Sequence, residues 1–199
     1  MITTLLFDLG GVLFTNGTKE FVRTFSSKFN FEHSLVTDLL DGEIGTSYRE
    51  GKISRDEFWS RFLGKLNLSH LDIEQVENEW IYSYKLIEET RDIILSLSKR
   101  YKIYYLSDNV RERVEKINSK HDFLKWFEGG IFSHEAGVRK PHPDVYLKAL
   151  ELTQSKPEET IFIDDKKINL PPAEKLGMKT ILFTSPESLE IDLKGLGIT

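Results

Sequence analysis

Residues 5–13 constrain the fold of this chain more than any other stretch. They form an apolar run with no charged residue before Asp8, and Gly10 and Gly11 follow shortly after it. A short apolar run that stops at glycine is typical of a strand buried on both faces of a parallel sheet. Asp8 then lies at the carboxyl end of that strand, where open parallel sheets bind their ligands. An aspartate that only closes a turn is the alternative, and this stretch alone leaves both open.

The second half of the chain alternates apolar runs with helical patterns. We expect helices at residues 87–97 and 144–152, and another that ends at Gly177. Strands are expected at residues 103–106, 130–133, 160–163 and 180–183. Strands that alternate with helices at this spacing predict right-handed parallel connections. The predicted fold class is therefore α/β, with a doubly wound, Rossmann-like parallel sheet.

A helical segment interrupts this alternation. Residues 15–87 contain no β-branched run of strand length, and their apolar residues recur at helical spacing. Residues 54–57 and 72–75 have the order of polar residues that caps the start of a helix. We therefore expect a small helical cap domain at residues 15–87, inserted into a Rossmann-like core domain of residues 1–14 and 88–199.

Within this segment, residues 41–52 are rich in glycine and charge, which predicts an exposed and mobile loop. Tyr48 and Arg49 lie in it, and an exposed ring and guanidinium group facing the active edge would contact a substrate. Trp59 and Trp80, by contrast, are expected to fill the core of the helical segment rather than to enclose a substrate.

The composition limits the classes of function. The net charge of -5 over 199 residues argues against nucleic acid as a partner. Cysteine is absent, so disulfides and thiolate catalysis are excluded. No apolar run approaches the ~20 residues of a membrane span, and the uncharged first residues predict no signal peptide. We expect a cytoplasmic protein, a monomer or weak homodimer, with no membrane or nucleic-acid partner.

Polar residues recur where the predicted strands end. Asp8, Ser107, Lys140 and the pair Asp164 and Asp165 each follow a strand directly or stand in the next loop. The strand ends of a parallel sheet share one edge, so these side chains are expected to converge on one cavity. Three carboxylates close together repel one another unless a cation lies among them. Oxygen ligands without histidine or cysteine favour Mg²⁺.

A lysine and a hydroxyl group beside such an ion suit a phosphoryl group. Lys140 and Ser107 would bind its oxygens, which leaves Asp8 free to attack phosphorus and form an aspartyl-phosphate that water hydrolyses. The pattern therefore predicts phosphoryl transfer. The alternatives are that Ser107 caps the following helix and that Lys140 is a solvated loop residue.

Four motifs in order resemble those of the haloacid dehalogenase-like (HAD) hydrolase superfamily. They are Asp8 with Gly10, Gly11 and Val12; Leu106 and Ser107; Arg139, Lys140 and Pro141; and Ile163, Asp164, Asp165 and Asn169, followed by Leu176, Gly177 and Met178. The helical segment resembles the C1-type cap of that superfamily. The chain length, the cap and residues 51–54 look most like those of small sugar-phosphate phosphatases of the glucose-1-phosphate phosphatase kind.

This resemblance implies a Mg²⁺-dependent phosphatase of a small phosphorylated metabolite, with a sugar phosphate as the expected class. Asp8 would be the nucleophile, and Lys140 would pair with it and with the phosphate. The implied metal ligands are Asp8, the Gly10 carbonyl, Asp164 and Asp165, bound directly or through water. The implied phosphate contacts are Gly11, Ser107, Asp108, Asn109 and Lys140.

Gly10 departs from the family pattern. The usual residue at this position is a second aspartate, which protonates the leaving group and activates water. Glycine offers a backbone oxygen to a metal but moves no proton, and positioned acid–base catalysis is typically worth about 10² to 10⁴ in rate. Slow turnover, a good leaving group or another donor would follow. Thr15 and Asn16 are near in sequence but are poor acids.

Two other functions stay open. In a 2-haloacid dehalogenase the same aspartate attacks carbon, but those enzymes lack the acidic pair found here at Asp164 and Asp165. In a binding or regulatory protein, the phosphate pocket would persist while turnover is lost through Gly10.

Overall fold

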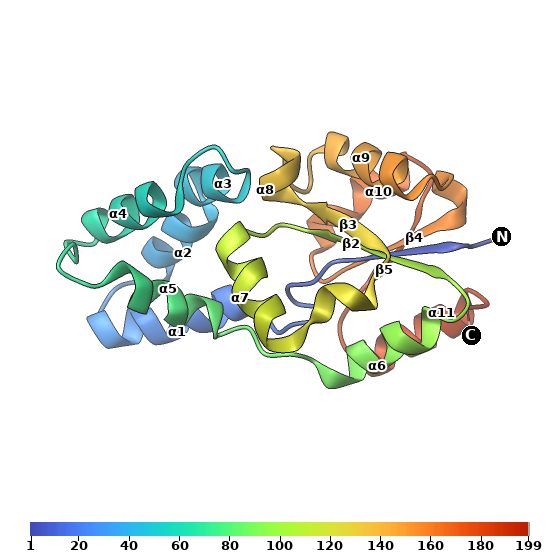
Figure 1. Ribbon diagram of the computed structural model, residues 1–199, viewed down its shortest axis with the longest axis horizontal. Coiled ribbons are helices and arrows are strands. Elements are labelled where there is room, and N and C mark those ends of the chain that lie inside the picture. Colours follow the sequence, from blue (N-terminus) through green and yellow to red (C-terminus); the bar gives the residue numbers. More distant parts are fainter. Residues whose placement is uncertain (199) are drawn as a thin grey trace.

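The computed structural model describes residues 1–198 and contains a five-stranded parallel sheet with the strand order β3-β2-β1-β4-β5 (Figure 1). The strands are β1 Thr4–Phe7, β2 Lys102–Ser107, β3 Gly129–Phe132, β4 Thr160–Asp164 and β5 Lys179–Leu182. The last four differ from the expected ranges by at most one residue at either end. The predicted doubly wound, Rossmann-like α/β fold is confirmed.

Strand β1 lies at the centre of the sheet and is buried on both faces. Leu6 pairs in register with Tyr104 of β2 and Phe162 of β4. Leu5 and Phe7 pack in the larger of two apolar clusters, whereas Leu6 packs in the smaller cluster on the opposite face. Successive side chains of a strand alternate between faces, so this position requires an uninterrupted apolar run. The charged residue that follows is thereby placed at the edge of the sheet.

Helices cover both faces of the sheet (Figure 1). The larger apolar cluster joins one face to α6 Glu88–Leu97, α7 Arg111–His121 and α11 Pro186–Gly195. The smaller cluster joins the other face to α9 Pro143–Thr153 and α10 Leu170–Lys175. The remaining short elements are η1 Phe123–Trp126, α8 Ser133–Ala136, η2 Pro157–Glu159 and η3 Lys167–Asn169. Within residues 1–198, no helix has both the length and the apolar character that crossing a membrane requires.

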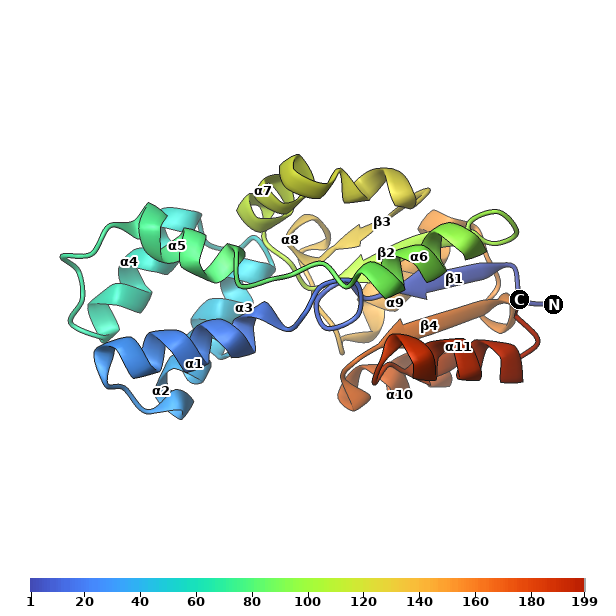
Figure 2. The ribbon, with the colours of Figure 1, turned by 90° about the horizontal axis from the view of Figure 1, so that it is seen from below.

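Beyond the carboxyl ends of the strands, further helices form a group of their own (Figure 2). We call this group the helical module; it consists of α1 Gly17–Phe29, α2 His33–Asp41, α3 Glu43–Arg49, α4 Arg55–Lys65 and α5 Ile73–Ile81. Both predicted helix caps form, because Ser54 accepts a hydrogen bond from the Glu57 amide and Asp72 accepts one from the Gln75 amide.

Aromatic rings fill the centre of the helical module. The centroid of the Trp59 ring lies 5.0 Å from that of Phe58, 5.3 Å from that of Phe62 and 5.6 Å from that of Trp80. Trp59 and Trp80 are at most 1% exposed, as expected for core residues. Rings of this size bury large apolar areas, so this cluster holds the short helices of the module together.

The two connections between the sheet and the helical module run side by side. The Thr15 amide donates to the Lys85 carbonyl, and the Ile87 amide donates to the Leu13 carbonyl, both at 2.8 Å. The module therefore leaves and rejoins the sheet at one place. This arrangement supports the division into a cap at residues 15–87 and a core, which stays a prediction.

The expectation of a mobile loop at residues 41–52 is wrong, because most of this stretch is helix α3. Tyr48 and Arg49, expected to be exposed, are each 4% exposed. A Cβ atom at Gly45 would overlap a carbonyl oxygen near the end of α2, so this glycine permits close packing of α2 and α3 rather than flexibility. The charge of Arg49 is balanced within this stretch, because its guanidinium group lies 3.0 Å from the Asp41 carboxylate.

Candidate active site

Three polar residues lie at the ends of adjacent strands. Ser107 is the last residue of β2, Asp164 is the last residue of β4, and Asp8 directly follows β1 between them. The Asp8 amide donates to the Ile163 carbonyl at 2.8 Å, which continues the ladder one residue beyond β1. The parallel order β2-β1-β4 thus brings side chains that are far apart in the sequence to one edge.

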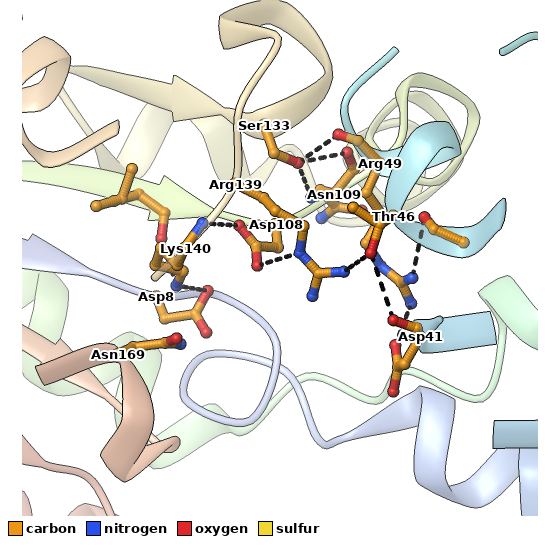
Figure 3. A network of polar contacts seen from close by, with 12 residues as sticks. Asp8, Asp41, Thr46, Arg49, Asp108, Asn109, Ser133, Arg139, Lys140 and Asn169 are labelled. Carbon is orange, nitrogen blue, oxygen red and sulfur yellow. Dashed lines mark hydrogen bonds and ion pairs between the residues drawn. The ribbon is translucent and has the colours of Figure 1, made fainter. Parts of the chain in front are cut away.

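The Lys140 ammonium group connects two of these carboxylates (Figure 3 shows its contact with Asp8). Its Nζ atom lies 3.1 Å from Asp8 Oδ1 and 2.6 Å from Asp164 Oδ2, and it donates to the Leu106 carbonyl at 2.9 Å. The side chain is only 1% exposed. A buried ammonium group requires such partners, because burial disfavours an unpaired charge. The alternative of Lys140 as a solvated loop residue is wrong.

Asp108 holds the loop that carries Lys140. The Lys140 amide donates to Asp108 Oδ1 and the Arg139 guanidinium group donates to Asp108 Oδ2, both at 3.1 Å. Arg139 also donates to Thr46 Oγ1 of α3 at 3.0 Å (Figure 3). Both carboxylate oxygens of Asp108 are engaged by protein groups. Asp108 therefore positions Lys140 and links the sheet edge to the helical module, and it also lines the cavity described below. The phosphate contact expected of it stays a prediction.

Asp164 is fully buried and fully engaged. Its Oδ1 accepts hydrogen bonds from the Lys166 amide at 2.8 Å and from the Asn169 side chain at 3.0 Å. Its Oδ2 accepts from Lys140 at 2.6 Å and again from Asn169 at 3.0 Å. Donors on both oxygens fix the plane of the carboxylate. Asp164 is thereby oriented toward Lys140.

Asp165 presents an unsatisfied oxygen next to this network. Its Oδ1 is buried and has no hydrogen-bond partner among residues 1–198. Gly11 packs against the same carboxylate with φ +94°, and a Cβ atom there would overlap Asp165 Oδ2. Asp8, Asp164 and Asp165 offer oxygen atoms that lie within 4.8 Å of one another. An unsatisfied buried carboxylate oxygen in an all-oxygen donor set fits a hard divalent cation such as Mg²⁺.

The site holds more buried negative charge than one lysine balances. Burial, partly offset by Lys140 and reinforced by repulsion from Asp164, raises the pKa of Asp8 to about 7. Burial and the Asp164 charge also raise the pKa of Asp165. Although burial alone lowers the pKa of an ammonium group, Asp164 and Asp8 raise that of Lys140. Lys140 therefore stays charged, and a further cation would keep Asp8 and Asp165 ionised.

A cavity of about 910 Å³ lies between the sheet edge and the helical module. Asp8, Ser107 and Lys140 line it on the side of the sheet, and Thr18 and Arg49 line it on the side of the module. Cavities of roughly 300 to 1,000 Å³ are the usual size of small-molecule sites. The geometry suits a small ligand that reaches Asp8 with one end.

Not all of the other residues expected to contact phosphate lie at the cavity. Ser107 and Asn109 line the cavity, but Gly11 does not and instead lies against the acidic pair. The alternative of Ser107 as a helix cap is wrong, because α7 begins after Val110 and its first turn has no side-chain cap. The Ser107 side chain therefore faces the cavity without capping α7, whereas Asn109 Oδ1 accepts a hydrogen bond from the Val110 amide at 3.0 Å.

Tyr84 covers the position where family members carry the second aspartate. A Cβ atom at Gly10 would lie 3.5 Å from Cε1 of the Tyr84 ring, and one at Gly17 would overlap the ring. The Tyr84 hydroxyl forms a hydrogen bond of 2.6 Å with Thr18 Oγ1. The ring thus packs against both glycines, and the absence of a side chain at Gly17 leaves space for it.

Sequence reasoning missed Tyr84 and Arg113, which both line the cavity. Arg113 lies on α7, whose residues are mostly polar and indicate a solvated helix, yet its side chain is 2% exposed. No local pattern marks either residue, because both gain their place from contacts between the helical module and the sheet. Asn169, by contrast, stands in the fourth motif, and its spacing from Asp164 is a usable signal.

Comparisons with known proteins give relatives of similar length. The family model of the haloacid dehalogenase-like hydrolases matches residues 2–177. A D-ribitol-5-phosphate phosphatase from Bacteroides thetaiotaomicron is 27% identical over 189 residues, which cover 90% of this chain and 91% of that protein. A glyceraldehyde 3-phosphate phosphatase from Pyrococcus furiosus is 28% identical over 211 residues, which cover 97% of this chain and 85% of that protein.

A solved structure shares the architecture. A HAD family enzyme from Bacteroides thetaiotaomicron, in complex with magnesium and inorganic phosphate, matches with a TM-score of 0.77 and 27% identity. The match covers 92% of this chain and 95% of that one. Because the family match spans most of the residues and the fold agrees, the chain belongs to the haloacid dehalogenase-like hydrolase family.

Proposed function

We propose that this protein is a Mg²⁺-dependent phosphatase that hydrolyses a small phosphorylated metabolite through an aspartyl-phosphate on Asp8. The observation that carries the proposal is the contact of Lys140 with both Asp8 and Asp164, beside the unsatisfied oxygen of Asp165. A phosphoryl group in transfer requires positive charge on its oxygens, which an ammonium group and a divalent cation supply. The relatives named as phosphatases and the structure with magnesium and phosphate support this chemistry.

Asp8, Asp165 and the Gly10 carbonyl would hold the ion. Asp165 is the stronger candidate for a direct ligand within the acidic pair, because its Oδ1 has no donor whereas both oxygens of Asp164 accept hydrogen bonds. Asp164 instead orients Lys140. When bound, Mg²⁺ would neutralise charge on the phosphoryl oxygens and reduce their repulsion of the Asp8 carboxylate.

Asp8 is oriented for attack on phosphorus. Its Oδ1 accepts from the Leu9 amide at 2.7 Å and lies 3.1 Å from Lys140 Nζ, so Oδ2 is the oxygen left to act as nucleophile. As Oδ2 bonds to phosphorus, the ester P–O bond breaks and the alcohol leaves. Water then attacks the phosphorus of the aspartyl-phosphate, which releases inorganic phosphate and restores Asp8.

Proton transfer limits this site. Gly10 supplies no acid, so the departing alkoxide takes its proton from water, and no side chain at this position activates the water of the second step. We therefore propose slow turnover of ordinary alkyl phosphates and faster turnover of esters with good leaving groups.

A small sugar phosphate is the proposed substrate class. The relatives named as D-ribitol-5-phosphate and glyceraldehyde 3-phosphate phosphatases support it, and a cavity of about 910 Å³ accommodates such a ligand. We also propose that residues 15–87 act as a cap that opens and closes over the substrate. The adjacent connections at Thr15 and Lys85 support a hinge there.

A second candidate function is favoured by Gly10 itself. A protein that keeps Lys140 and the three clustered carboxylates but lacks the acid would bind a phosphorylated ligand without hydrolysing it. A dehalogenase is disfavoured, because attack on carbon needs no cation and leaves the carboxylate cluster without a role.

Steady-state hydrolysis tests the proposal. p-Nitrophenyl phosphate and a panel of sugar phosphates are assayed with Mg²⁺ and with EDTA, for the wild type, Asp8→Asn and the exposed control Asp92→Asn. Activity that requires both the ion and Asp8 supports the phosphatase. Binding of Mg²⁺ and phosphate without hydrolysis of any ester would favour the binding protein, and release of halide from a 2-haloacid in EDTA would favour the dehalogenase.

A further inference from the structure

Arg113 is a buried cation that forms no ion pair with an acidic side chain of residues 1–198. It lies on α7, is 2% exposed and lines the cavity. The carbon of its guanidinium group lies 4.0 Å from the centroid of the Trp80 ring and 4.4 Å from that of the Tyr84 ring. Its Nε and Nη2 atoms are buried and donate to no acceptor within residues 1–198. The faces of the group are in contact with rings, while its N–H edge lacks partners.

The other buried cations of the cavity wall are paired, which sets Arg113 apart. Arg49 forms an ion pair with Asp41 at 3.0 Å. Lys140 lies 3.1 Å from Asp8 and makes a second, shorter ion pair. Among residues 1–198, Arg113 is therefore the buried cationic side chain of the cavity wall that lacks a hydrogen-bond acceptor.

Two carboxylates of the same region are engaged elsewhere. Glu112 accepts a hydrogen bond from the Tyr48 hydroxyl at 2.8 Å. The carboxylate of Glu77 accepts two hydrogen bonds from Arg55, at 3.0 and 2.9 Å. Neither carboxylate is hydrogen-bonded to Arg113, although both lie in the contact zone between α7 and the helical module.

The chemistry of the guanidinium group indicates what is missing. Ring faces attract its charge but do not accept the N–H groups that lie in its plane. Buried charges in proteins are otherwise paired, so the missing acceptor is expected on a ligand that enters the cavity and reaches this edge as the surrounding side chains shift. Carboxylates and phosphates match the planar donor edge, because two of their oxygens accept two parallel N–H bonds.

Tyr84 places Arg113 close to the catalytic loop. The same ring that contacts the guanidinium group lies 3.5 Å from the Cβ position of Gly10, two residues after Asp8. Lys140 serves the phosphoryl group at the sheet edge, whereas Arg113 lies against the helical module. A small ligand whose phosphoryl group is at Asp8 would therefore meet Arg113 with another part.

We propose that Arg113 forms a second anion subsite, which binds a carboxylate or a second phosphate of the substrate at a point away from the reacting phosphoryl group. The inference rests on the proposed phosphatase function and narrows its substrates to esters with a second anionic group. The charge of the cavity wall agrees, since eight cationic and four acidic side chains among residues 1–198 line it. A sugar phosphate with no anionic group besides its reacting phosphate would leave the N–H edge of Arg113 without an anionic acceptor.

Two matched pairs of esters test the subsite. 3-Phosphoglycerate has a carboxylate where glycerol 3-phosphate has a hydroxymethyl group, and glucose 1,6-bisphosphate has a phosphate that glucose 1-phosphate lacks. Selectivity is the ratio of kcat/KM for the ester with the second anion to that of its partner. The wild type is expected to favour the second anion in at least one pair. Arg113→Met is expected to lower that selectivity by about 10- to 100-fold, mainly through KM.

Arg23→Met is the matched control. Arg23 lines the same cavity, but its side chain is 65% exposed and already pairs with Glu20 at 2.6 Å. The same substitution there removes the same charge, and selectivity is expected to stay within about fivefold of the wild type. A similar drop in both variants would overturn the inference, because net charge rather than Arg113 would then set the selectivity.

The subsite and the phosphatase proposal fail in different ways. Hydrolysis of p-nitrophenyl phosphate with equal selectivity in the wild type and Arg113→Met overturns the subsite and leaves the phosphatase standing. If no ester is hydrolysed, the phosphatase fails. Calorimetric binding of the same four esters then decides the subsite, and equal affinities within both pairs overturn it.

A folding defect in Arg113→Met would be detected by circular dichroism, and Arg113→Gln then replaces it. Glutamine keeps a polar side chain of similar length but carries no charge. Selectivity that remains at the wild-type level in a folded Arg113→Gln variant contradicts the proposal. Selectivity that falls as in the first test supports it.

Discussion

Position 10 carries no side chain, and the Tyr84 ring lies against the space where one would begin. Gly10→Asp places a carboxyl group there, because the new Cβ atom lies at an ordinary contact distance of 3.5 Å from the ring. Turnover of glucose 1-phosphate is expected to rise by up to about 10²-fold, since its alkoxide needs a proton to leave. Turnover of p-nitrophenyl phosphate changes less, because nitrophenolate leaves unprotonated. Steady-state kinetics on both esters measures the difference.

Gly10→Asn is the control for this prediction. Asparagine has the shape of aspartate but donates no catalytic proton, so it is expected to give no gain on either ester. Equal increases in turnover for the two variants, or equal increases for the two esters, would show that the lack of a proton donor at position 10 does not limit the rate.

Two features require glycine at position 11: its positive φ and the close approach of the Asp165 carboxylate. Its φ is +94°, and a Cβ atom there would overlap Asp165 Oδ2. Gly11→Ala is expected to lower the free energy of unfolding by about 1–3 kcal/mol and to weaken Mg²⁺ binding, because Asp165 must move. The matched control is Gly137→Ala, where φ is +72° but nothing lies within 4 Å of the new Cβ atom. Urea denaturation and calorimetric Mg²⁺ titration measure both effects, and equal Mg²⁺ affinity in the two variants would contradict the prediction.

The sequence predicts which residues stand at the strand ends but not what each one contacts. Asp8, Lys140 and Asp164 follow from the strand pattern, because the carboxyl ends of parallel strands share an edge. Asp108 also follows a strand, yet its two oxygens bind the Arg139 and Lys140 loop. Arg139 and Lys140 lie 31 and 32 residues after Asp108 in the sequence, and no local pattern predicts contacts over such a separation.

At the scale of elements, strands were predicted well and one helix was not. An apolar run buried on both faces has few alternatives, so β1 and β4 follow from their residues alone. Gly42 directly precedes helix α3 and Gly45 lies inside it, and two glycines so close together indicate a loop when only the local sequence is considered. Contact with α2 decides the outcome there, because only a residue without a Cβ atom fits at position 45.

Two glycine substitutions in the helical module are expected to have opposite effects on stability. Gly45→Ala is expected to destabilise the fold by more than about 1 kcal/mol, because the new methyl group overlaps the backbone of α2. Gly64→Ala, at an exposed position of helix α4, is expected to stabilise it by roughly 0.5–1 kcal/mol, since the nearest described atom to the new Cβ atom is Ser69 Oγ at 3.9 Å. Thermal denaturation measures both. A flexible loop at position 45 would instead make its substitution neutral.

At the scale of the whole molecule, the carboxylate cluster makes stability depend on pH. Without a cation, burial raises the pKa of Asp8 from 3.8 to about 7. Between those values the folded state binds a proton that the unfolded state releases, so stability falls as pH rises from about 4 to about 7. Mg²⁺ is expected to reduce this loss, because it favours the ionised carboxylate.

Thermal unfolding between pH 4.5 and 7.5, with EDTA and with Mg²⁺, measures this dependence. Subtracting the profile of Asp8→Asn from that of the wild type isolates the contribution of Asp8. A difference that does not vary with pH in EDTA would contradict the raised pKa.

The helical module is tied to the sheet by polar as well as apolar contacts. Lys116 of α7 lies 3.1 Å from Glu77 of α5 and donates to Asn78 at 2.7 Å. The Tyr48 hydroxyl of α3 donates to Glu112 of α7 at 2.8 Å. Helix α7 is therefore the surface on which the module rests, and Arg113 lies on this same helix.

The paired connections at Thr15 and Lys85 have a consequence for how such a chain diversifies. Because the module begins and ends at neighbouring points, its length and composition can change without altering the order or the register of the strands. The proposed reaction depends on residues at the strand ends, whereas much of the cavity wall belongs to the helical module. Replacing residues 15–87 with a different insertion would therefore change which ligand binds while leaving the residues of the proposed phosphoryl transfer in place. The fold is thus suited to acquiring new substrates through changes in this one segment.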